Sequence, residues 1–122
     1  MLFGAWVLAL AILALFFNRL ISHQENPNRD PVAAADASGR MQVVLARNRS
    51  GHYVADGRIN GAPVRFLVDT GATDVALPLE LARRLELPLG AARISRTANG
   101  NVRVWSTRLG SVDLGGLRLS DV

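Results

Sequence analysis

Residues 66–73 read Phe-Leu-Val-Asp-Thr-Gly-Ala-Thr, and this stretch decides how the rest of the chain is interpreted. We expect an apolar strand that delivers one carboxylate, Asp69, followed at once by the hydroxyl of Thr70 and by a glycine, Gly71. A glycine there allows a turn tight enough for the backbone to approach the carboxylate. A carboxylate held rigidly among donors suits a general acid or base. The alternative is that Asp69 only caps a turn.

Short β-type runs separated by turn residues fill the chain from residue 40 onward. Asn60-Gly61 and Asn99-Gly100 each predict a two-residue hairpin turn, because a type I′ turn needs positive φ at both central positions. One helical pattern begins at Pro78 and ends before Pro88. The sequence therefore predicts a small all-β domain with one short helix. The expected strands are 41–46, 53–60, 63–68, 75–77, 92–98 and 102–107, followed by a third hairpin within 109–119 around Gly115-Gly116.

An uncharged apolar run opens the chain and extends from residue 2 to residue 17. About 20 helical residues cover the ~30 Å hydrocarbon core of a bilayer. We interpret residues 1–21 as an uncleaved transmembrane helix; the alternative is a secretory signal peptide, which would need a basic start and a small-residue cleavage site. Residues 22–39 contain two prolines and no sustained apolar period, so we expect a flexible linker. The folded domain then spans 40–122.

The composition excludes several kinds of chemistry. The chain has no cysteine, which rules out disulfides, thiolate zinc sites and cysteine nucleophiles, and His23 and His52 are its only imidazoles. We therefore expect no metal site and no cofactor. All 14 positive side chains are arginine, and they are scattered singly with few aromatic residues between them. This pattern does not favour a nucleic-acid partner.

A single carboxylate is insufficient for hydrolysing a peptide bond with water. One carboxylate must accept a proton from the water while a second, kept protonated, supports the carbonyl oxygen. The chain contains one Asp-Thr-Gly sequence. A monomer therefore cannot supply both groups from this motif.

Residues 59–72, Ile-Asn-Gly-Ala-Pro-Val-Arg-Phe-Leu-Val-Asp-Thr-Gly-Ala, are followed by Leu77-Pro78 and a helix. Over roughly residues 41–122 the chain resembles the membrane-anchored, retropepsin-like aspartic proteases of proteobacteria. The resemblance implies a retropepsin-like acid-protease β-barrel that acts as a homodimer on protein or peptide substrates and needs no cofactor. It also implies a single-pass protein of the bacterial inner membrane with its catalytic domain in the periplasm. Arg19 and Arg29 follow the apolar helix and favour the opposite orientation, which leaves the side of the membrane open.

The same resemblance assigns roles to individual residues. Asp69 is the expected catalytic carboxylate, Thr70 hydrogen-bonds to the equivalent loop of the second subunit, and Gly71 allows the turn and binds substrate backbone. The hairpin around Asn99-Gly100 is the expected flap, a lid that closes over substrate. For Asp74, a solvated acid or a salt bridge to an arginine is an equally good interpretation. The expected substrate-binding residues are Ala72, Thr73, Asp74, Asn99 and Gly100.

The end of the chain departs from the family pattern. Such proteases continue with two apolar residues, a glycine and an aromatic residue, then a helix and a final strand, and nothing after Gly116 matches before Asp121-Val122. We therefore expect the C-terminal part of the protease domain to be missing. The leading hypothesis is an aspartic endopeptidase, and the alternative is a non-catalytic, membrane-tethered, protease-like β domain.

Overall fold

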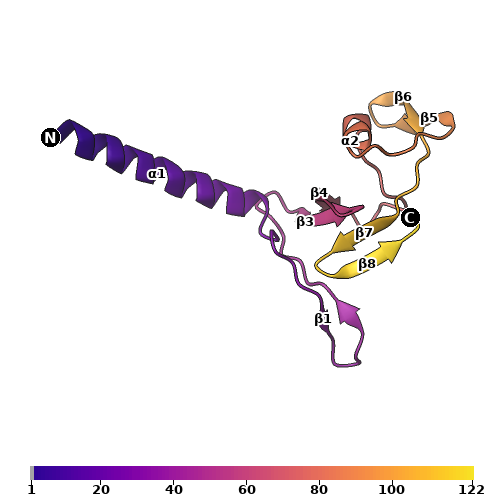
Figure 1. Cartoon of the computed structure of the whole chain (residues 1–122), viewed down its shortest axis with the longest axis horizontal. Coiled ribbons are helices and arrows are strands. Elements are labelled where there is room, and N and C mark those ends of the chain that lie inside the picture. The colour runs from indigo at the N-terminus through magenta and orange to yellow at the C-terminus, as the bar shows by residue number, and fades with distance from the viewer. Residues whose placement is uncertain (1) are drawn as a thin grey trace.

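The architecture is taken from a computed structural model, which describes residues 2–122 (Figure 1). A long N-terminal helix projects from a body of short strands, and the C-terminus lies in that body. The expected class, mostly β with one short helix after an N-terminal apolar helix, is confirmed. The elements are α1 (Leu2–Glu25), β1 (Ala34–Ala35), β2 (Met41–Gln42), β3 (Tyr53–Ile59), β4 (Ala62–Val68), α2 (Leu79–Arg84), β5 (Ala92–Thr97), β6 (Gly100–Trp105), β7 (Ser111–Leu114) and β8 (Leu117–Ser120).

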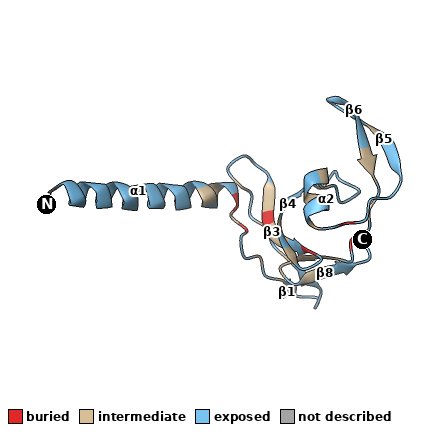
Figure 2. Cartoon of the chain, turned by 45° about the horizontal axis from the view of Figure 1, so that its top comes forward, coloured by how far each residue is buried: buried red, intermediate tan, exposed pale blue. Residues whose placement is uncertain are grey.

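Helix α1 carries the apolar segment at the start of the chain. Its span from Phe3 to Glu25 is long and apolar enough to cross a membrane, and its most apolar part is not buried against the body. Figure 2 shows its exposure along almost its whole length. The helix continues beyond residue 21, where the sequence places the end of the anchor. By length and composition, α1 fits a bilayer.

The junction between α1 and the body is closely packed around Asn28. This side chain is buried, and its Nδ2 donates hydrogen bonds to the carbonyl oxygens of Ala46 and Val54, at 2.9 and 2.8 Å. Its Oδ1 accepts the backbone N–H of Ala46 at 2.7 Å. The start of segment 22–39 is therefore fixed, which differs from the flexible linker that the sequence suggests. Composition does not reveal such long-range bonds, which hold a buried amide in place.

Asn26 makes a second contact at this junction. It is completely buried, and its Nδ2 donates a 2.7 Å hydrogen bond to the carboxylate of Asp56 on β3. Asp56 also forms an ion pair with Arg65 on β4, at 3.1 Å. One carboxylate thus joins the end of the helix to the two strands that lead to the Asp-Thr-Gly turn.

The largest sheet has the strand order β4-β3-β7-β8, with every neighbouring pair antiparallel. Asn60 and Gly61, with φ of 49° and 80°, join β3 to β4, as the sequence predicts. Gly115 and Gly116, with φ of 63° and 95°, join β7 to β8 and confirm the third expected hairpin. The sheet is open, and β4 and β8 form its edges.

The core lies between this sheet and α2. Its buried members are Ile59, Ala82, Leu87 and Leu109, and partly buried apolar residues surround them, namely Val64, Phe66, Leu77, Leu85 and Val112. Burial of apolar side chains contributes most of the stability of such a small body. The core therefore fixes β4, and with it the turn that follows.

Helix α2 begins after Pro78 and ends before Pro88, as expected. Glu86 adopts a left-handed φ of 55°, and the N–H of Leu87 donates to the carbonyl of Ala82 at 2.9 Å. The N–H of Glu86 donates to the carbonyl of Arg83 at 3.0 Å. This pair of hydrogen bonds is a Schellman C-cap, which returns Leu87 to the core.

Two expected strands are corrected by the structure. The run 41–46 pairs only over Met41–Gln42, with β1 as its partner. Residues 75–77 are not a strand, and Val75 is exposed. An apolar run becomes a strand only where a neighbouring strand can accept its backbone hydrogen bonds. Within residues 2–122, no strand lies beside 75–77.

The second hairpin is confirmed, but its turn lies one residue earlier than expected. Thr97 pairs with Gly100, so Ala98 and Asn99 form the turn and Gly100 opens β6. The hydroxyl of Thr97 donates to the carbonyl of Gly100 at 2.8 Å and accepts the N–H of Asn99 at 3.3 Å. Gly100, the residue directly after this turn, adopts a positive φ of 109°. Local side-chain bonds of this kind compete with the expected turn.

Candidate active site

The Asp-Thr-Gly turn begins where β4 ends. Val68 is the last residue of the strand and pairs with Tyr53, which places Asp69 at the edge of the sheet beside the start of β3. The N–H of Gly71 donates a 2.9 Å hydrogen bond to Oδ1 of Asp69. The N–H of Ala72 donates to the carbonyl oxygen of Asp69 at 3.1 Å. The structure thus brings Asp69, Gly71 and Ala72 together in one tight turn.

Asp69 is exposed, and so are the residues that follow it as far as Val75. The carboxylate has one backbone donor at Oδ1, and within the described residues no hydrogen bond to its Oδ2 is formed. A rigid, open carboxylate can exchange a proton with water or with a second acid. By itself it cannot both activate water and donate a proton to a carbonyl oxygen.

The polar residues after the turn interact with one another only weakly. The hydroxyl of Thr73 donates to Oδ2 of Asp74 at 3.4 Å, which is long for this kind of bond. Within residues 2–122, Asp74 forms no ion pair, so the sequence alternative of a salt bridge to an arginine is not found. Thr70 makes no side-chain hydrogen bond in the same range. These groups are available to a ligand or to another chain.

The expected flap lies apart from this turn. Asn99 and Gly100 are at the tip of the β5–β6 hairpin, which stands away from the sheet in Figures 1 and 2. Hydrogen bonds at its base join Gly90 to Ser106 and the hydroxyl of Thr107 to the carbonyl of Pro88. Within the described chain, no hydrogen bond connects the tip to residues 69–74. The predicted site residues therefore form two groups, one at the turn and one at the hairpin tip.

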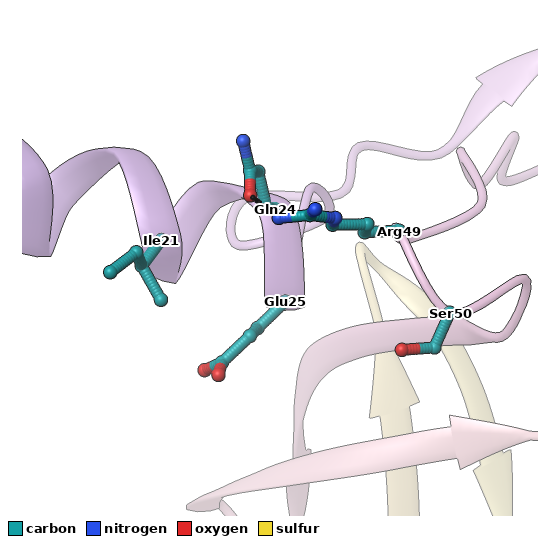
Figure 3. A pocket seen from close by; sticks show the side chains of 5 residues that line it. All are labelled: Ile21, Gln24, Glu25, Arg49 and Ser50. Atoms are coloured by element: carbon teal, nitrogen blue, oxygen red, sulfur yellow. Dashed lines mark hydrogen bonds between the residues drawn. The ribbon is translucent and has the colours of Figure 1, made fainter.

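A hollow lies elsewhere, at the end of α1 (Figure 3). Its volume is about 360 Å³, and it is lined by Ile21, Gln24, Glu25, Arg49 and Ser50. Arg49 donates from Nη1 to Oε1 of Gln24 at 3.2 Å, while the side chain of Glu25 points away. Sequence reasoning missed this contact and the neighbouring asparagine bonds. The local sequence pattern that could have pointed to these bonds is Asn-Pro-Asn at residues 26–28.

The fold and the turn together define a retropepsin-like protein. The chain is similar to the crystal structure of a retropepsin-like aspartic protease from Rickettsia conorii, with 36% identity and a TM-score of 0.56. The similarity covers 64% of this chain and 67% of that chain. At 36% sequence identity, the two chains are similar in sequence as well as in fold.

The family follows from the sequence match. Residues 55–122 match the family described as "gag-polyprotein putative aspartyl protease", which is more than half of the chain. The chain belongs to this family of retropepsin-like aspartic proteases.

Two curated bacterial relatives are longer proteins. An uncharacterised protein of Rickettsia prowazekii (strain Madrid E) is 35% identical over 77 residues, which cover 61% of this chain and 33% of the relative. An uncharacterised protein from the cobV 5′ region of Sinorhizobium sp. is 31% identical over 103 residues, covering 82% of this chain and 43% of the relative. The chain thus spans less than half of the length of either relative.

Proposed function

We propose that the chain is the anchored part of an aspartic endopeptidase whose two catalytic carboxylates are the Asp69 side chains of two copies. The observation that carries this proposal is the position of Asp69, exposed at the end of a core strand and fixed by the N–H of Gly71. The chain has one such turn, and peptide hydrolysis needs two carboxylates. A homodimer supplies the second.

The reaction requires that the two carboxylates share one proton, because like charges held close together do not both ionise. The ionised Asp69 takes a proton from water, and the water oxygen bonds to the carbonyl carbon of the substrate. The protonated Asp69 gives its proton to the carbonyl oxygen. The carboxyl that took the proton from water then gives it to the amide nitrogen, the other carboxylate takes a proton from a hydroxyl of the tetrahedral intermediate, and the carbon–nitrogen bond breaks, which restores the singly protonated pair.

The remaining site residues take supporting roles in this proposal. Thr70 bonds across the two-fold axis to the same turn of the partner, and Gly71 binds substrate backbone. The open exposure of this turn supports both assignments. The hairpin tip acts as a flap, whose closure excludes water from the dyad. The proposed substrate-binding residues are Ala72, Thr73, Asp74, Asn99 and Gly100.

The apolar helix α1 anchors each copy in the bacterial inner membrane in this proposal. Its exposed apolar surface and its length support an anchor. Confinement to the membrane raises the effective concentration of the partner and so favours the dimer. We place the catalytic domain in the periplasm, and cysteine labelling from either side of spheroplasts, at an introduced Ser50→Cys, tests that side.

The function is tested by an isosteric substitution. We expect Asp69→Asn to abolish cleavage of a peptide library by the full chain in detergent, a loss of at least about a thousandfold, because it removes one ionisable group from each half of the dyad. Asp121→Asn is the matched control, since it removes an exposed carboxylate far along the chain from the turn. Cleavage retained by a folded Asp69→Asn chain would contradict the proposal and favour a non-catalytic β domain.

A further inference from the structure

The β5–β6 hairpin carries positive charge without any compensating acid. Residues 87–112 contain four arginines and no aspartate or glutamate. The ion pairs formed within residues 2–122 involve Arg40 and Arg65, neither of which is in the hairpin. All four arginines of the hairpin region are exposed: Arg93, Arg96, Arg103 and Arg108.

The register places two of these arginines on one face. Ile94 pairs with Arg103, and Arg96 pairs with Asn101, so these side chains alternate along the same side of the two strands. Trp105 extends this face toward the base of the hairpin. Ile94 is 63% exposed, so its apolar side chain is accessible on this face. The face therefore offers guanidinium groups beside accessible apolar surface.

We propose that this hairpin face binds acidic peptide segments, so that the substrates of the protease carry aspartate or glutamate next to apolar residues. This inference rests on the proposed function. Guanidinium groups bind carboxylates through two parallel hydrogen bonds, and free arginines on a closing flap give the substrate that geometry. An extended acidic segment presents a side chain to the same face at every second residue.

An anionic membrane surface would be the other partner for positive charge, and the position of the hairpin speaks against it. Figures 1 and 2 both show the hairpin on the side of the body away from α1. The lipid headgroups would lie near the Glu25 end of that helix. Attraction to them falls off within a Debye length, about 10 Å at 0.1 M salt.

The test measures binding separately from cleavage. The full chain carrying Asp69→Asn is placed in nanodiscs of phosphatidylcholine, and fluorescence anisotropy follows a short labelled peptide of alternating Glu and Val. Peptides of alternating Lys and Val, and of Gln and Val, serve as comparisons. We expect the Glu peptide to bind most tightly, with an affinity that falls as salt is raised.

Paired variants locate the binding face. Arg96→Gln with Arg103→Gln is expected to weaken binding of the Glu peptide by about tenfold, a few-fold for each exposed charge pair. Arg96→Lys with Arg103→Lys should retain part of the affinity. Arg83→Gln with Arg84→Gln, on the exposed side of α2, changes the net charge equally and should leave binding unchanged. An equal loss in both glutamine pairs would overturn the proposal, because net charge alone would then explain binding.

Two further results separate this inference from the proposed function. Binding of the Glu peptide without cleavage by the native chain would contradict the protease and leave the acidic-peptide face standing. Cleavage of all three peptides at equal rates, with equal affinities, would overturn the acidic-peptide face and leave the protease standing.

A vesicle experiment tests the membrane alternative. If the chain bound vesicles containing phosphatidylglycerol but not the Glu peptide, and the Arg96 and Arg103 glutamine pair lost that vesicle binding, the face would be assigned to the membrane instead.

Discussion

The junction at the end of α1 and the turn at the end of β4 are built in opposite ways. At the junction, Asn26 and Asn28 are buried and bonded to residues far along the chain. At the turn, Asp69 and its neighbours are exposed, and among the described residues their side chains bond only within the turn itself. The junction is complete within one copy of the chain, whereas the turn leaves its polar groups free. This difference supports the proposal of an anchored enzyme whose active site is shared between two copies.

The largest expected effect on stability lies at the junction. Asn28→Ala removes three hydrogen bonds and leaves the N–H of Ala46 and the carbonyls of Ala46 and Val54 without their partner. We expect the free energy of unfolding to fall by about 3 kcal/mol, since each buried polar group left unpaired costs about 1–3 kcal/mol. Thermal unfolding followed by circular dichroism at the β-sheet band measures the loss.

Asn101→Ala is the matched control for this comparison. Asn101 is exposed on β6 and makes no side-chain hydrogen bond within the described residues. Its removal should change the free energy of unfolding by less than about 0.5 kcal/mol. Equal effects of the two alanine substitutions would show that the junction is no more fixed than the hairpin, and the contrast between the regions would fail.

A smaller effect is expected at the end of α2. Glu86 holds a left-handed φ of 55° at the position where the C-cap favours glycine. Glu86→Gly should therefore raise the free energy of unfolding by about 1 kcal/mol, because the strained conformation costs glycine nothing. Chemical denaturation measures this gain. A decrease would mean that the entropy lost by glycine on folding exceeds the strain relieved.

The smallest effect concerns the turn between β1 and β2. The hydroxyl of Ser38, followed by the N–H of Arg40, holds the pKa of Asp36 below its ordinary value. Because the folded pKa is the lower one, the stabilisation of the turn is present above the unfolded pKa and is lost as pH falls through the folded value. The amide resonances of Ser38 and Arg40 should shift below about pH 4. They should stay constant there in an Asp36→Asn chain.

Local sequence predicted the parts of the fold that local chemistry decides. Asn60-Gly61 and Gly115-Gly116 supply two positive φ values in succession, and the structure places a hairpin at each. Pro78 and Pro88 set the limits of α2. The sequence also predicted the Asp-Thr-Gly turn, because a glycine placed two residues after an aspartate can bring its own N–H to the carboxylate.

Contacts between distant residues could not be read in the same way. The bonds of Asn28 reach residues 46 and 54, and no local pattern reports which strand a buried amide will meet. The second hairpin turn lies one residue earlier than the sequence predicts, at the position where the hydroxyl of Thr97 bonds to Asn99 and Gly100. The charged face of the hairpin emerged only from the register that sets Arg103 opposite Ile94.

The central claim, an active site shared by two copies of the chain, is tested most directly by mixing. Native chain and Asp69→Asn chain are combined in detergent at varied ratios and constant total concentration, allowed to exchange, and assayed for peptide cleavage. A shared dyad predicts that activity falls as the square of the native fraction, because only pairs of two native chains are active. Replacing the inactive chain by Asp121→Asn should leave activity unchanged. A decrease in direct proportion to the native fraction would contradict the shared site.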